Sequence, residues 1–486
     1  MKARSAATLL LLLVLACVSP PAYSQQLSAD LKARRAKVME RLGPNSILIL
    51  FSADEKVYSN DVNYEFRQDS NLFYLTGVDQ PDTILVLMPG NQERREMLFV
   101  KPPDPTQEHW TGHVLDKQEA TRASGVATVN TTNQFETFLA SILSGRPFGA
   151  PAQEYDTFFR ALQENKAKVN LMLGPAPKLE DKLSESYQFA NKLRERYSGF
   201  MVADATPILR DLRQVKTDYE QQALQESANI SAEAHMAGMK AAKPGAWEYE
   251  VEAAIEYVYK KNGAFDWGYP SIVGSGPNAT TLHYEKSTRQ MNDGDLLLVD
   301  AAGFFKYVTV DITRTYPVNG KFTPAQKDIY NIVLQAQEEG MKVAKAGNKL
   351  SDVHAKTVEV IKDGLFKLGL ITDKSGDQYR TWYTHGSTHW IGIDVHDVGE
   401  NQRALTPGMA FTIEPGIYIR ESALDNLPKT PENAAFIAKV RPMVQKYKDM
   451  GIRIEDSFLL TNNGLTRLSA KVPRTIEEIE AFMKSR

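Results

Sequence analysis

Cysteine is almost absent from this chain of 486 residues, which contains only Cys17. A single thiol cannot form a disulfide framework, so the disulfide-rich scaffolds are excluded. An excess of charge of one sign is also absent, because the net charge is −3 and the pI is about 6.3. Nothing in this balance attracts nucleic acid or an anionic membrane surface. Beyond the N-terminus, no segment has the roughly 20 consecutive apolar residues that a membrane-spanning helix requires.

The N-terminus carries one long apolar run, from Ala6 to Val18, and two basic residues precede it. The run is too short to span a membrane, and a small-x-small site ending at Ser24 follows it. This pattern is typical of a secretory signal peptide. We therefore expect the signal peptide to cover residues 1–24, with cleavage near Ser24 and export to the periplasm or the medium. In the alternative, the residues before Cys17 act as a lipoprotein cleavage box and Cys17 becomes a lipid anchor.

The length predicts two domains, because a single hydrophobic core rarely grows beyond about 250–300 residues. We expect an N-terminal domain over residues 25–206 and a C-terminal domain over 207–486. The N-terminal part has a mixed α/β pattern. Its strands are predicted over 46–51, 83–88 and 97–100, its helices over 163–168 and 180–196, and the linker over 203–207.

The C-terminal part repeats its element order. Two helices are predicted over 217–242 and 247–261 and strands follow; two more helices are predicted over 324–344 and 351–368, and strands follow again. The junction Lys243–Ala253 aligns with Lys345–Ala355 at an offset of 102 residues, although chance similarity of helix-start residues would give such a short match too. Together with the repeated order, it indicates a duplicated unit whose halves pack with sheets inward and helices outward. The expected fold class is α/β (α+β).

Four carboxylates and one histidine lie at the edges of short apolar segments in this second part: Asp300, Asp311, His389, Glu414 and Glu455. Burying such acids is costly unless something positive meets them. Each acid taken alone fits a turn or surface position equally well, and only the joint pattern indicates a pair of divalent metal ions. The sequence therefore predicts a metallohydrolase, with its site on the central strands between the two halves.

An oxygen-rich donor set favours hard or borderline ions such as Mn, Mg, Co or Fe(II), whereas structural zinc would favour cysteine and more histidine. Two such ions about 3.5–4 Å apart can share bridging carboxylates and hold a hydroxide between them. The second ion then polarises the carbonyl group under attack. A nearby carboxylate can take the proton of the attacking water and pass it to the leaving nitrogen.

Longer motifs surround these residues and span the whole second domain: Pro270–Gly276, Leu282–Tyr284, Leu298–Ala301, Asp311–Thr315, His385–Trp390, Asp394–Gly399, Thr412–Tyr418 and Gly451–Asp456. With them, the chain resembles the Xaa-Pro aminopeptidases (aminopeptidase P) of the creatinase/prolidase/methionine-aminopeptidase "pita-bread" superfamily. Phe66–Gly77 resembles the N-terminal domain of the same family. The resemblance implies a mixed α/β N-terminal domain followed by a duplicated pita-bread metallopeptidase domain.

The resemblance also implies a role for each metal-site residue. Asp300 would bind one metal ion, Asp311 and Glu455 would bridge the two ions, and His389 and Glu414 would complete the second. Glu414 would in addition carry the proton of the attacking hydroxide. The expected metal is Mn²⁺, with Co²⁺, Fe²⁺ or Zn²⁺ as alternatives.

Further residues would surround the substrate by the same resemblance. His283, His385 and His396 would orient the scissile carbonyl and the proline and stabilise the oxyanion. Of these, His385 and His396 would be catalytic residues together with Glu414. Arg453 and Tyr418 would hold metal ligands or substrate. Trp110 would reach the site of a neighbouring subunit.

The implied activity is removal of an N-terminal residue from peptides that have proline in second position. The implied assembly is a homodimer or homotetramer. Two alternatives stay open: a prolidase, which shares the fold and the ligands and cleaves Xaa-Pro dipeptides, and a metal-free pita-bread binding module. For Arg314 and Asp397, the sequence does not separate a role in the site from a role in the fold.

Overall fold

The structure, a computed structural model, describes residues 22–485. The predicted signal peptide, apart from its last three residues, and Cys17 lie outside this range. Among the described residues, no helix combines the length and the apolar character needed to cross a membrane.

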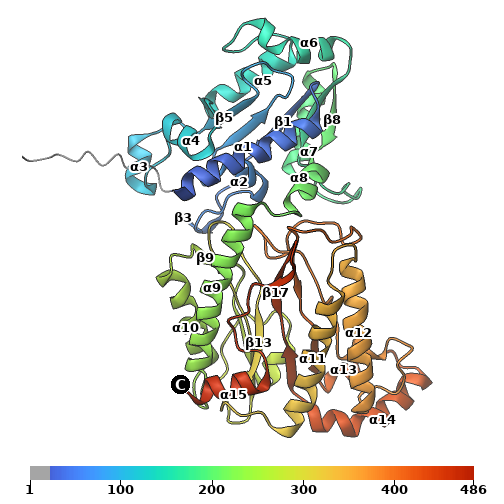
Figure 1. Cartoon of the computed structure of the whole chain (residues 1–486). Helices are drawn as coiled ribbons and strands as arrows, with labels where there is room; N and C mark the ends of the chain where they lie inside the picture. Colours follow the sequence, from blue (N-terminus) through green and yellow to red (C-terminus); the bar gives the residue numbers. More distant parts are fainter. Residues whose placement is uncertain (1–21, 486) are drawn as a thin grey trace, which may run out of the picture. The chain divides into compact units, whose positions relative to one another are not determined.

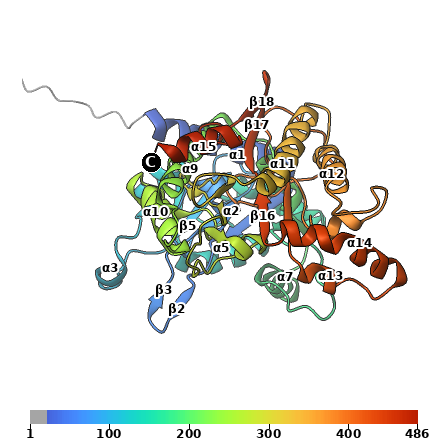
Figure 2. The same cartoon turned by 90° about the horizontal axis from the view of Figure 1, so that it is seen from below.

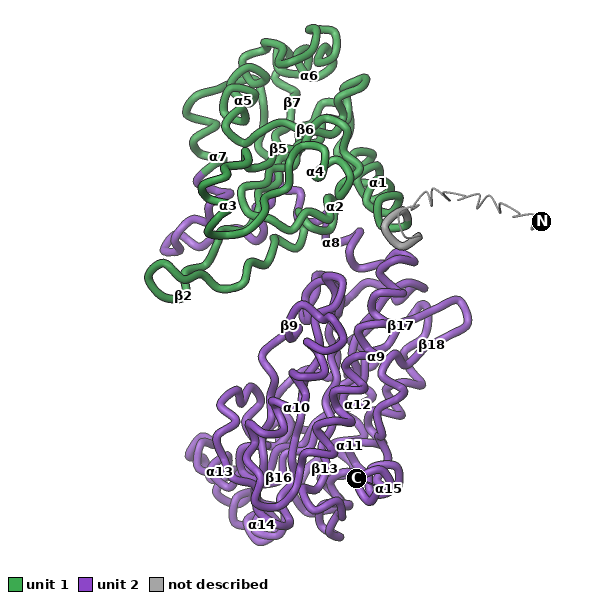
Figure 3. Tube along the Cα trace, turned by 90° about the vertical axis from the view of Figure 1, so that its left-hand side faces the viewer, with its two compact units in different colours: residues 1–170, 189–202 green, residues 171–188, 203–486 purple. Residues whose placement is uncertain are grey.

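Two compact units divide the chain (Figure 3). Unit 1 comprises residues 1–170 and 189–202, and unit 2 comprises residues 171–188 and 203–486. Apart from the segment 171–188, unit 2 begins at residue 203, whereas the predicted C-terminal domain begins at 207.

Unit 1 is built around a mixed sheet with the strand order β6-β5-β4-β1-β7-β8. The strands are β1 Ser46–Phe51, β4 Ile84–Leu87, β5 Glu96–Val100, β6 Thr128–Thr131, β7 Ala167–Leu171 and β8 Phe200–Asp204, with a separate hairpin β2 Val57–Ser59 and β3 Val62–Asn63. The central strands β1 and β4 are antiparallel and β1 and β7 are parallel. The three strands predicted for this part are confirmed as β1, β4 and β5.

Helices flank this sheet (Figure 1). They are α1 Ala22–Leu42, α2 Ser70–Thr76, α3 Pro105–Thr111, α4 Lys117–Ser124, α5 Phe135–Leu143, α6 Asp156–Gln163 and α7 Glu185–Arg196. Several begin at an aspartate whose side chain accepts hydrogen bonds from the first turn, as Asp69 does for α2 and Asp116 for α4.

Two predictions in this region are wrong. Residues 163–168 are not a helix, because α6 ends at Gln163, Asn165 adopts a left-handed conformation (φ 56°), and β7 begins at Ala167. Burial of Val169 and Leu171 beside β1 outweighs the helix propensity of the charged residues before them. The predicted linker over 203–207 is the end of β8 and the start of α8, Thr206–Arg213.

Unit 2 confirms the repeated element order. Its first helix pair is α9 Asp218–Ala241 and α10 Glu248–Lys261, and its second is α11 Pro324–Val343 and α12 Leu350–Lys367. The first helix of each pair starts with the same device, a threonine capping box, formed by Thr217 with Glu220 and by Thr323 with Gln326. The remaining helices are α13 Ser422–Asp425, α14 Pro431–Tyr447 and α15 Ile476–Lys484.

The strands of unit 2 form short antiparallel sheets between the helix pairs. The strands are β9 Asp266–Trp267, β10 Ile272–Ser275, β11 Leu296–Asp300, β12 Gly303–Phe304, β13 Thr313–Pro317, β14 Ala410–Ile413, β15 Gly416–Ile419, β16 Met450–Arg453, β17 Asp456–Thr461 and β18 Gly464–Arg467. Figures 1 and 2 show α9 and α10 on one side of the central strands and α11 and α12 on the other. One bridge, between Thr313 and Glu455, joins the strands of the two halves directly.

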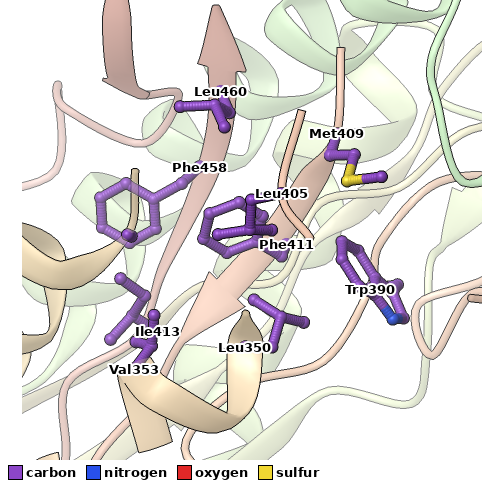
Figure 4. Packing of buried hydrophobic residues seen from close by; sticks show 10 residues of the cluster. Leu350, Val353, Trp390, Leu405, Met409, Phe411, Ile413, Phe458 and Leu460 are labelled. Atoms are coloured by element: carbon purple, nitrogen blue, oxygen red, sulfur yellow. The ribbon is translucent and has the colours of Figure 1, made fainter. Parts of the chain in front are cut away.

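An apolar cluster anchors the second half of unit 2 (Figure 4). Phe411 and Ile413 of β14 and Phe458 of β17 pack against Val353 of α12. Trp390 belongs to the same cluster and is 3% exposed. The burial of these side chains holds the sheet whose ends carry the candidate ligands.

Gly451 marks a close approach of two backbone segments in unit 2. A Cβ atom at this position would lie 1.9 Å from the carbonyl oxygen of Ala279, and backbone atoms cannot swing aside as a flexible side chain can. We expect Gly451→Ala to lower the free energy of unfolding by about 3 kcal/mol or more, measured by urea-induced unfolding. An unchanged unfolding midpoint would contradict this close approach.

Candidate metal centre

The ends of central strands bring the five predicted ligands together. Asp300 ends β11 and pairs in register with Thr313, which in turn bridges to Glu455 between β16 and β17. Glu414 lies between β14 and β15, and its backbone N–H donates to the carbonyl of Ser387 at 2.8 Å. Asp311 lies in the loop between β12 and β13.

His389 faces three of the carboxylates. Its Nε2 atom lies 3.3 Å from Asp311 Oδ2, 3.5 Å from Glu414 Oε1 and 3.5 Å from Glu455 Oε1. Ligand atoms of two triplets, His389 with Glu414 and Glu455, and Asp300 with Asp311 and Glu455, each lie within 4.8 Å of one another. All five predicted ligands therefore belong to one cluster.

The other nitrogen of His389 determines its tautomer. Nδ1 lies 3.1 Å from the carbonyl oxygen of Trp390, and a carbonyl oxygen only accepts, so Nδ1 carries the proton. In the neutral ring, Nε2 then presents a lone pair toward Asp311, Glu414 and Glu455. A histidine that ligates a metal commonly has this arrangement, with its second nitrogen bound to a backbone carbonyl.

Negative charge is concentrated in the cluster. Burial, together with the charge of Glu455, raises the pKa of Asp311 and of Glu414 well above the ordinary carboxyl value. Burial acts against protonation of His389, but the nearby carboxylates of Asp311, Glu455 and Glu414 raise its pKa well above the usual value. Asp300 differs, because Arg453 outweighs the effect of burial and lowers its pKa. A cation between these groups would relieve the repulsion.

Glu455 has a carboxylate oxygen that is available to a metal ion. Its side chain is 1% exposed, and its Oε1 atom has no hydrogen-bond partner. A buried carboxylate oxygen left unpaired is costly unless a cation binds it. The oxygen-rich donor set, the tautomer of His389 and this free oxygen together fit one or two divalent metal ions.

Tyr269, a residue that no sequence motif indicated, contacts two of the carboxylates. Its hydroxyl oxygen lies 2.6 Å from Asp300 Oδ1 and 2.6 Å from Asp311 Oδ1. The hydroxyl has one proton and can donate it to only one of the two oxygens at a time. Both oxygens nevertheless lie within hydrogen-bonding distance of the tyrosine. The residue precedes the motif at Pro270, but nothing in its neighbours indicates this contact.

A hydrogen-bonded chain leads from Asp300 to His385. Arg453 Nη2 lies 2.5 Å from Asp300 Oδ2, and Arg453 Nη1 donates to the hydroxyl of Tyr418 at 2.8 Å. The Tyr418 hydroxyl lies 2.8 Å from His385 Nε2, while His385 Nδ1 donates to the carbonyl of Gly386 at 2.7 Å. Tyr418 therefore donates to Nε2, and His385 is neutral. Burial lowers the pKa of His385 to about 3, and Arg453 contributes to the shift.

A cavity of about 270 Å³ opens over the cluster. Its lining includes the two exposed histidines predicted to contact substrate, His283 and His396, beside His385. The rings of His389 and His396 meet edge to face at 4.5 Å. Leu282, Gly386 and Thr388 also line the cavity, although their positions in the sequence indicate no role in the site.

Trp390, which ends one of the sequence motifs, and Trp110, which the resemblance assigns to a neighbouring subunit's site, are not among the residues that line this cavity. Trp390 is in the apolar core, where its indole N–H donates to Asn401 at 2.8 Å, so it does not line the cavity. Trp110 lies on α3 of unit 1 and is 82% exposed. Its role in a neighbouring subunit stays a prediction.

Arg314 supports the backbone of the site. Its guanidinium donates to the carbonyl oxygens of Thr313 at 2.9 Å and Glu455 at 2.7 Å, and pairs with Asp456 at 2.6 Å. Both side chains of this pair are 0% exposed. Arg314 therefore joins the start of β13 to the segment that carries Glu455 and Asp456, and it does not line the cavity.

Comparison with known proteins gives the same picture for both parts of the chain. Residues 222–462 match the model of metallopeptidase family M24, and residues 31–148 match the model of the aminopeptidase P N-terminal domain. The chain is 35% identical to a Xaa-Pro aminopeptidase of Haemophilus influenzae over 463 residues, which cover 93% of this chain and 97% of that one.

Solved structures are similar over nearly the whole chain. The Pseudomonas aeruginosa aminopeptidase PepP has a TM-score of 0.79 and 33% identity, covering 94% of this chain and 98% of the other. Zinc-substituted Escherichia coli aminopeptidase P in complex with product has a TM-score of 0.78 and 31% identity, with the same coverage of both chains. The expectation of a pita-bread fold behind a mixed α/β domain is confirmed.

Proposed function

Because this chain belongs to the Xaa-Pro aminopeptidases of metallopeptidase family M24, we propose that it removes the N-terminal residue of peptides with proline in second position, using two divalent metal ions. The observation that carries the proposal is the convergence of four buried or half-buried carboxylates and one imidazole on a single cavity.

The proposed ligands divide between two ions. Asp300, Asp311 and Glu455 form one triplet, and His389, Glu414 and Glu455 form the other. Glu455 belongs to both, which supports a bridging role, and Asp311 lies close to His389 as well as to Asp300. The oxygen-rich set favours Mn²⁺, with Co²⁺, Fe²⁺ or Zn²⁺ as alternatives. When bound, two such ions polarise a carbonyl group and make hydroxide available near neutral pH.

Glu414 is the proposed proton carrier. It is half-buried at the cavity, and its raised pKa brings the carboxyl group closer to the pH at which it works. Its Oε2 atom lies 3.5 Å from His385 Nδ1 and its Oε1 atom lies on the His389 side. In this position Glu414 can take a proton from water and release it to the prolyl nitrogen as the peptide bond breaks.

The histidines are the proposed substrate groups. His385 is held neutral by Tyr418 and Gly386, so it orients substrate without adding charge. His283 and His396 line the cavity mouth and are exposed, so a peptide can reach them. We propose that the three surround the scissile carbonyl and the proline ring and stabilise the developing oxyanion.

Proline explains the need for such a site. Its ring fixes φ and removes the amide N–H, so peptidases that bind a flexible backbone through that N–H fail on an Xaa-Pro bond. Shape recognition of the ring replaces that hydrogen bond. Peptides are therefore the proposed partners, with no nucleic acid. Export and a dimeric or tetrameric assembly remain proposals from the leader and from the family.

A direct test compares two substrates, the tripeptide Arg-Pro-Pro and the dipeptide Gly-Pro. We expect release of free Arg from the tripeptide in the presence of Mn²⁺, and its loss after chelation, because the ligand carboxylates cannot activate water without a cation. Amino-acid analysis of the products measures both reactions. Cleavage of the dipeptide alone would instead identify a prolidase. Cleavage of neither peptide by metal-loaded protein would favour the alternative of a pita-bread binding module.

A further inference from the structure

Thr313 occupies the junction between the two halves of unit 2. As the first residue of β13, it pairs in register with Asp300, and it forms the isolated bridge with Glu455. Its backbone carbonyl accepts from Glu455 N–H at 3.1 Å, and its side chain is fully buried. A single residue thus contacts the segments that carry ligands from both halves.

The hydroxyl of Thr313 relays between a cation and a carboxylate. It donates to Glu455 Oε2 at 2.8 Å and accepts from Arg453 Nε at 3.0 Å. Arg453 Nε and Glu455 Oε2 are 3.8 Å apart, too far for a direct hydrogen bond. The hydroxyl therefore provides the hydrogen-bonded connection between these two groups, using its one proton and one lone pair.

The other oxygen of Glu455 shows the consequence. Oε1 has no hydrogen-bond partner and lies on the side of His389. A carboxylate has about four lone-pair sites, and Thr313 occupies one of them on Oε2. One lone pair of Oε2 and both lone pairs of Oε1 therefore remain available to metal ions. The hydrogen bond to Thr313 fixes the plane of the carboxylate and does not block these positions.

We propose that Thr313 is a positioning residue that orients the Glu455 carboxylate to bridge two metal ions. This inference rests on the proposed function, because it requires two metal ions at the site. It assigns Thr313 no contact with substrate or metal. Its effect is on metal affinity, since a carboxylate free to rotate must be ordered when the ions bind. Loss of such a supporting hydrogen bond typically costs about 10–100-fold in metal affinity.

Thr315 provides a matched control. It lies two residues further along β13, is equally buried, and also makes two hydrogen bonds through its hydroxyl. Both bonds, however, go to backbone atoms of Arg453, at 3.0 Å and 3.2 Å, and none goes to a candidate ligand. Replacing either threonine by valine removes a buried hydroxyl from the same strand, so only an effect specific to Glu455 distinguishes the two.

The experiment titrates metal-free, full-length protein with Mn²⁺ by calorimetry, for the wild type, Thr313→Val, Thr313→Ser and Thr315→Val. We expect Thr313→Val to bind Mn²⁺ about 10–100-fold more weakly, and the serine and Thr315 variants to bind close to the wild type. The visible spectrum of Co²⁺-loaded protein, which reports ligand geometry, should change only in Thr313→Val. Thermal unfolding of the metal-free proteins checks that all are folded, and Thr313→Ala replaces the valine variant if that one is not.

Equal Mn²⁺ affinity in Thr313→Val and wild type would overturn the inference alone, as would an equal loss in Thr315→Val. An inability of the wild type to bind two ions would overturn the proposed function, and the inference with it. Recovery of affinity in Thr313→Ser supports it, because serine restores the hydroxyl and not the methyl group.

Discussion

Glu414→Gln is expected to lower kcat for Arg-Pro-Pro by about 10³-fold in protein saturated with Mn²⁺. An amide cannot take a proton from water or return one to the prolyl nitrogen, although it keeps the shape of the side chain. The amide also lacks the charge that Glu414 contributes near His389, so a higher Mn²⁺ concentration should be needed for saturation. Steady-state release of free Arg measures kcat, and metal analysis of the same samples separates the two effects.

Glu421→Gln is the control for this change. Glu421 is 39% exposed, pairs with Arg441 at 2.9 Å and does not line the cavity, so its neutralisation should leave kcat unchanged. If metal-saturated Glu414→Gln kept more than about a tenth of the wild-type rate, another group would have to carry the proton.

The second large effect concerns stability. Asp397→Asn is expected to lower the free energy of unfolding by about 3–5 kcal/mol, because it removes the buried negative charge that Arg213 and Lys216 share. Asp397 Oδ1 lies 2.5 Å from Arg213 Nη2, and Oδ2 lies 2.6 Å from Lys216 Nζ. All three side chains are no more than 2% exposed. Urea-induced unfolding of the full chain measures the loss.

Asp394 offers a matched comparison for this prediction. It pairs with the same Arg213 nitrogen at 2.7 Å, but its side chain is 36% exposed. Water can replace its charge, so Asp394→Asn should cost no more than about 1 kcal/mol. Equal losses in the Asp394 and Asp397 variants would refute the view that burial of the charges, rather than their pairing, determines the cost.

Acid unfolding provides a further check on Asp397. Burial alone would raise its pKa, but Lys216 and Arg213 outweigh it and lower the pKa below the usual value. The unfolded chain therefore binds this proton more readily, and stability rises with pH in this range. The contribution is complete above about pH 4 and is lost as the pH falls through the lowered pKa. The unfolding free energy of Asp397→Asn should accordingly depend less on pH below about 4 than that of the wild type.

The candidate ligands could be predicted because their chemistry is visible locally. An acid at the end of an apolar segment is costly to bury in a core without a cation, and four such acids together with one histidine reinforce one another. The helices of unit 2 were predictable for a similar reason, since a capping threonine such as Thr217 or Thr323 marks the start of each pair.

Residues whose role depends on long-range contacts could not be found in this way. Tyr269 binds Asp300 and Asp311, and Thr313 binds Glu455, 142 residues away along the chain. A threonine in a strand and a tyrosine before a proline have ordinary local explanations. The helix wrongly predicted over 163–168 has the same origin, because its charged residues favour a helix locally while the sheet recruits the segment that follows.

The sequence by itself determined the candidate metal donors of this protein, its duplicated element order and its family, since each is expressed in residue type and spacing along the chain. The tertiary structure alone decided which oxygen of Glu455 has no hydrogen-bond partner, which nitrogen of His389 donates to the backbone, and that Asp397 pairs with both Arg213 and Lys216. These features depend on atoms brought within hydrogen-bonding distance from separate strands and loops. Such distances arise only when burial of the apolar faces forces the two halves of unit 2 together.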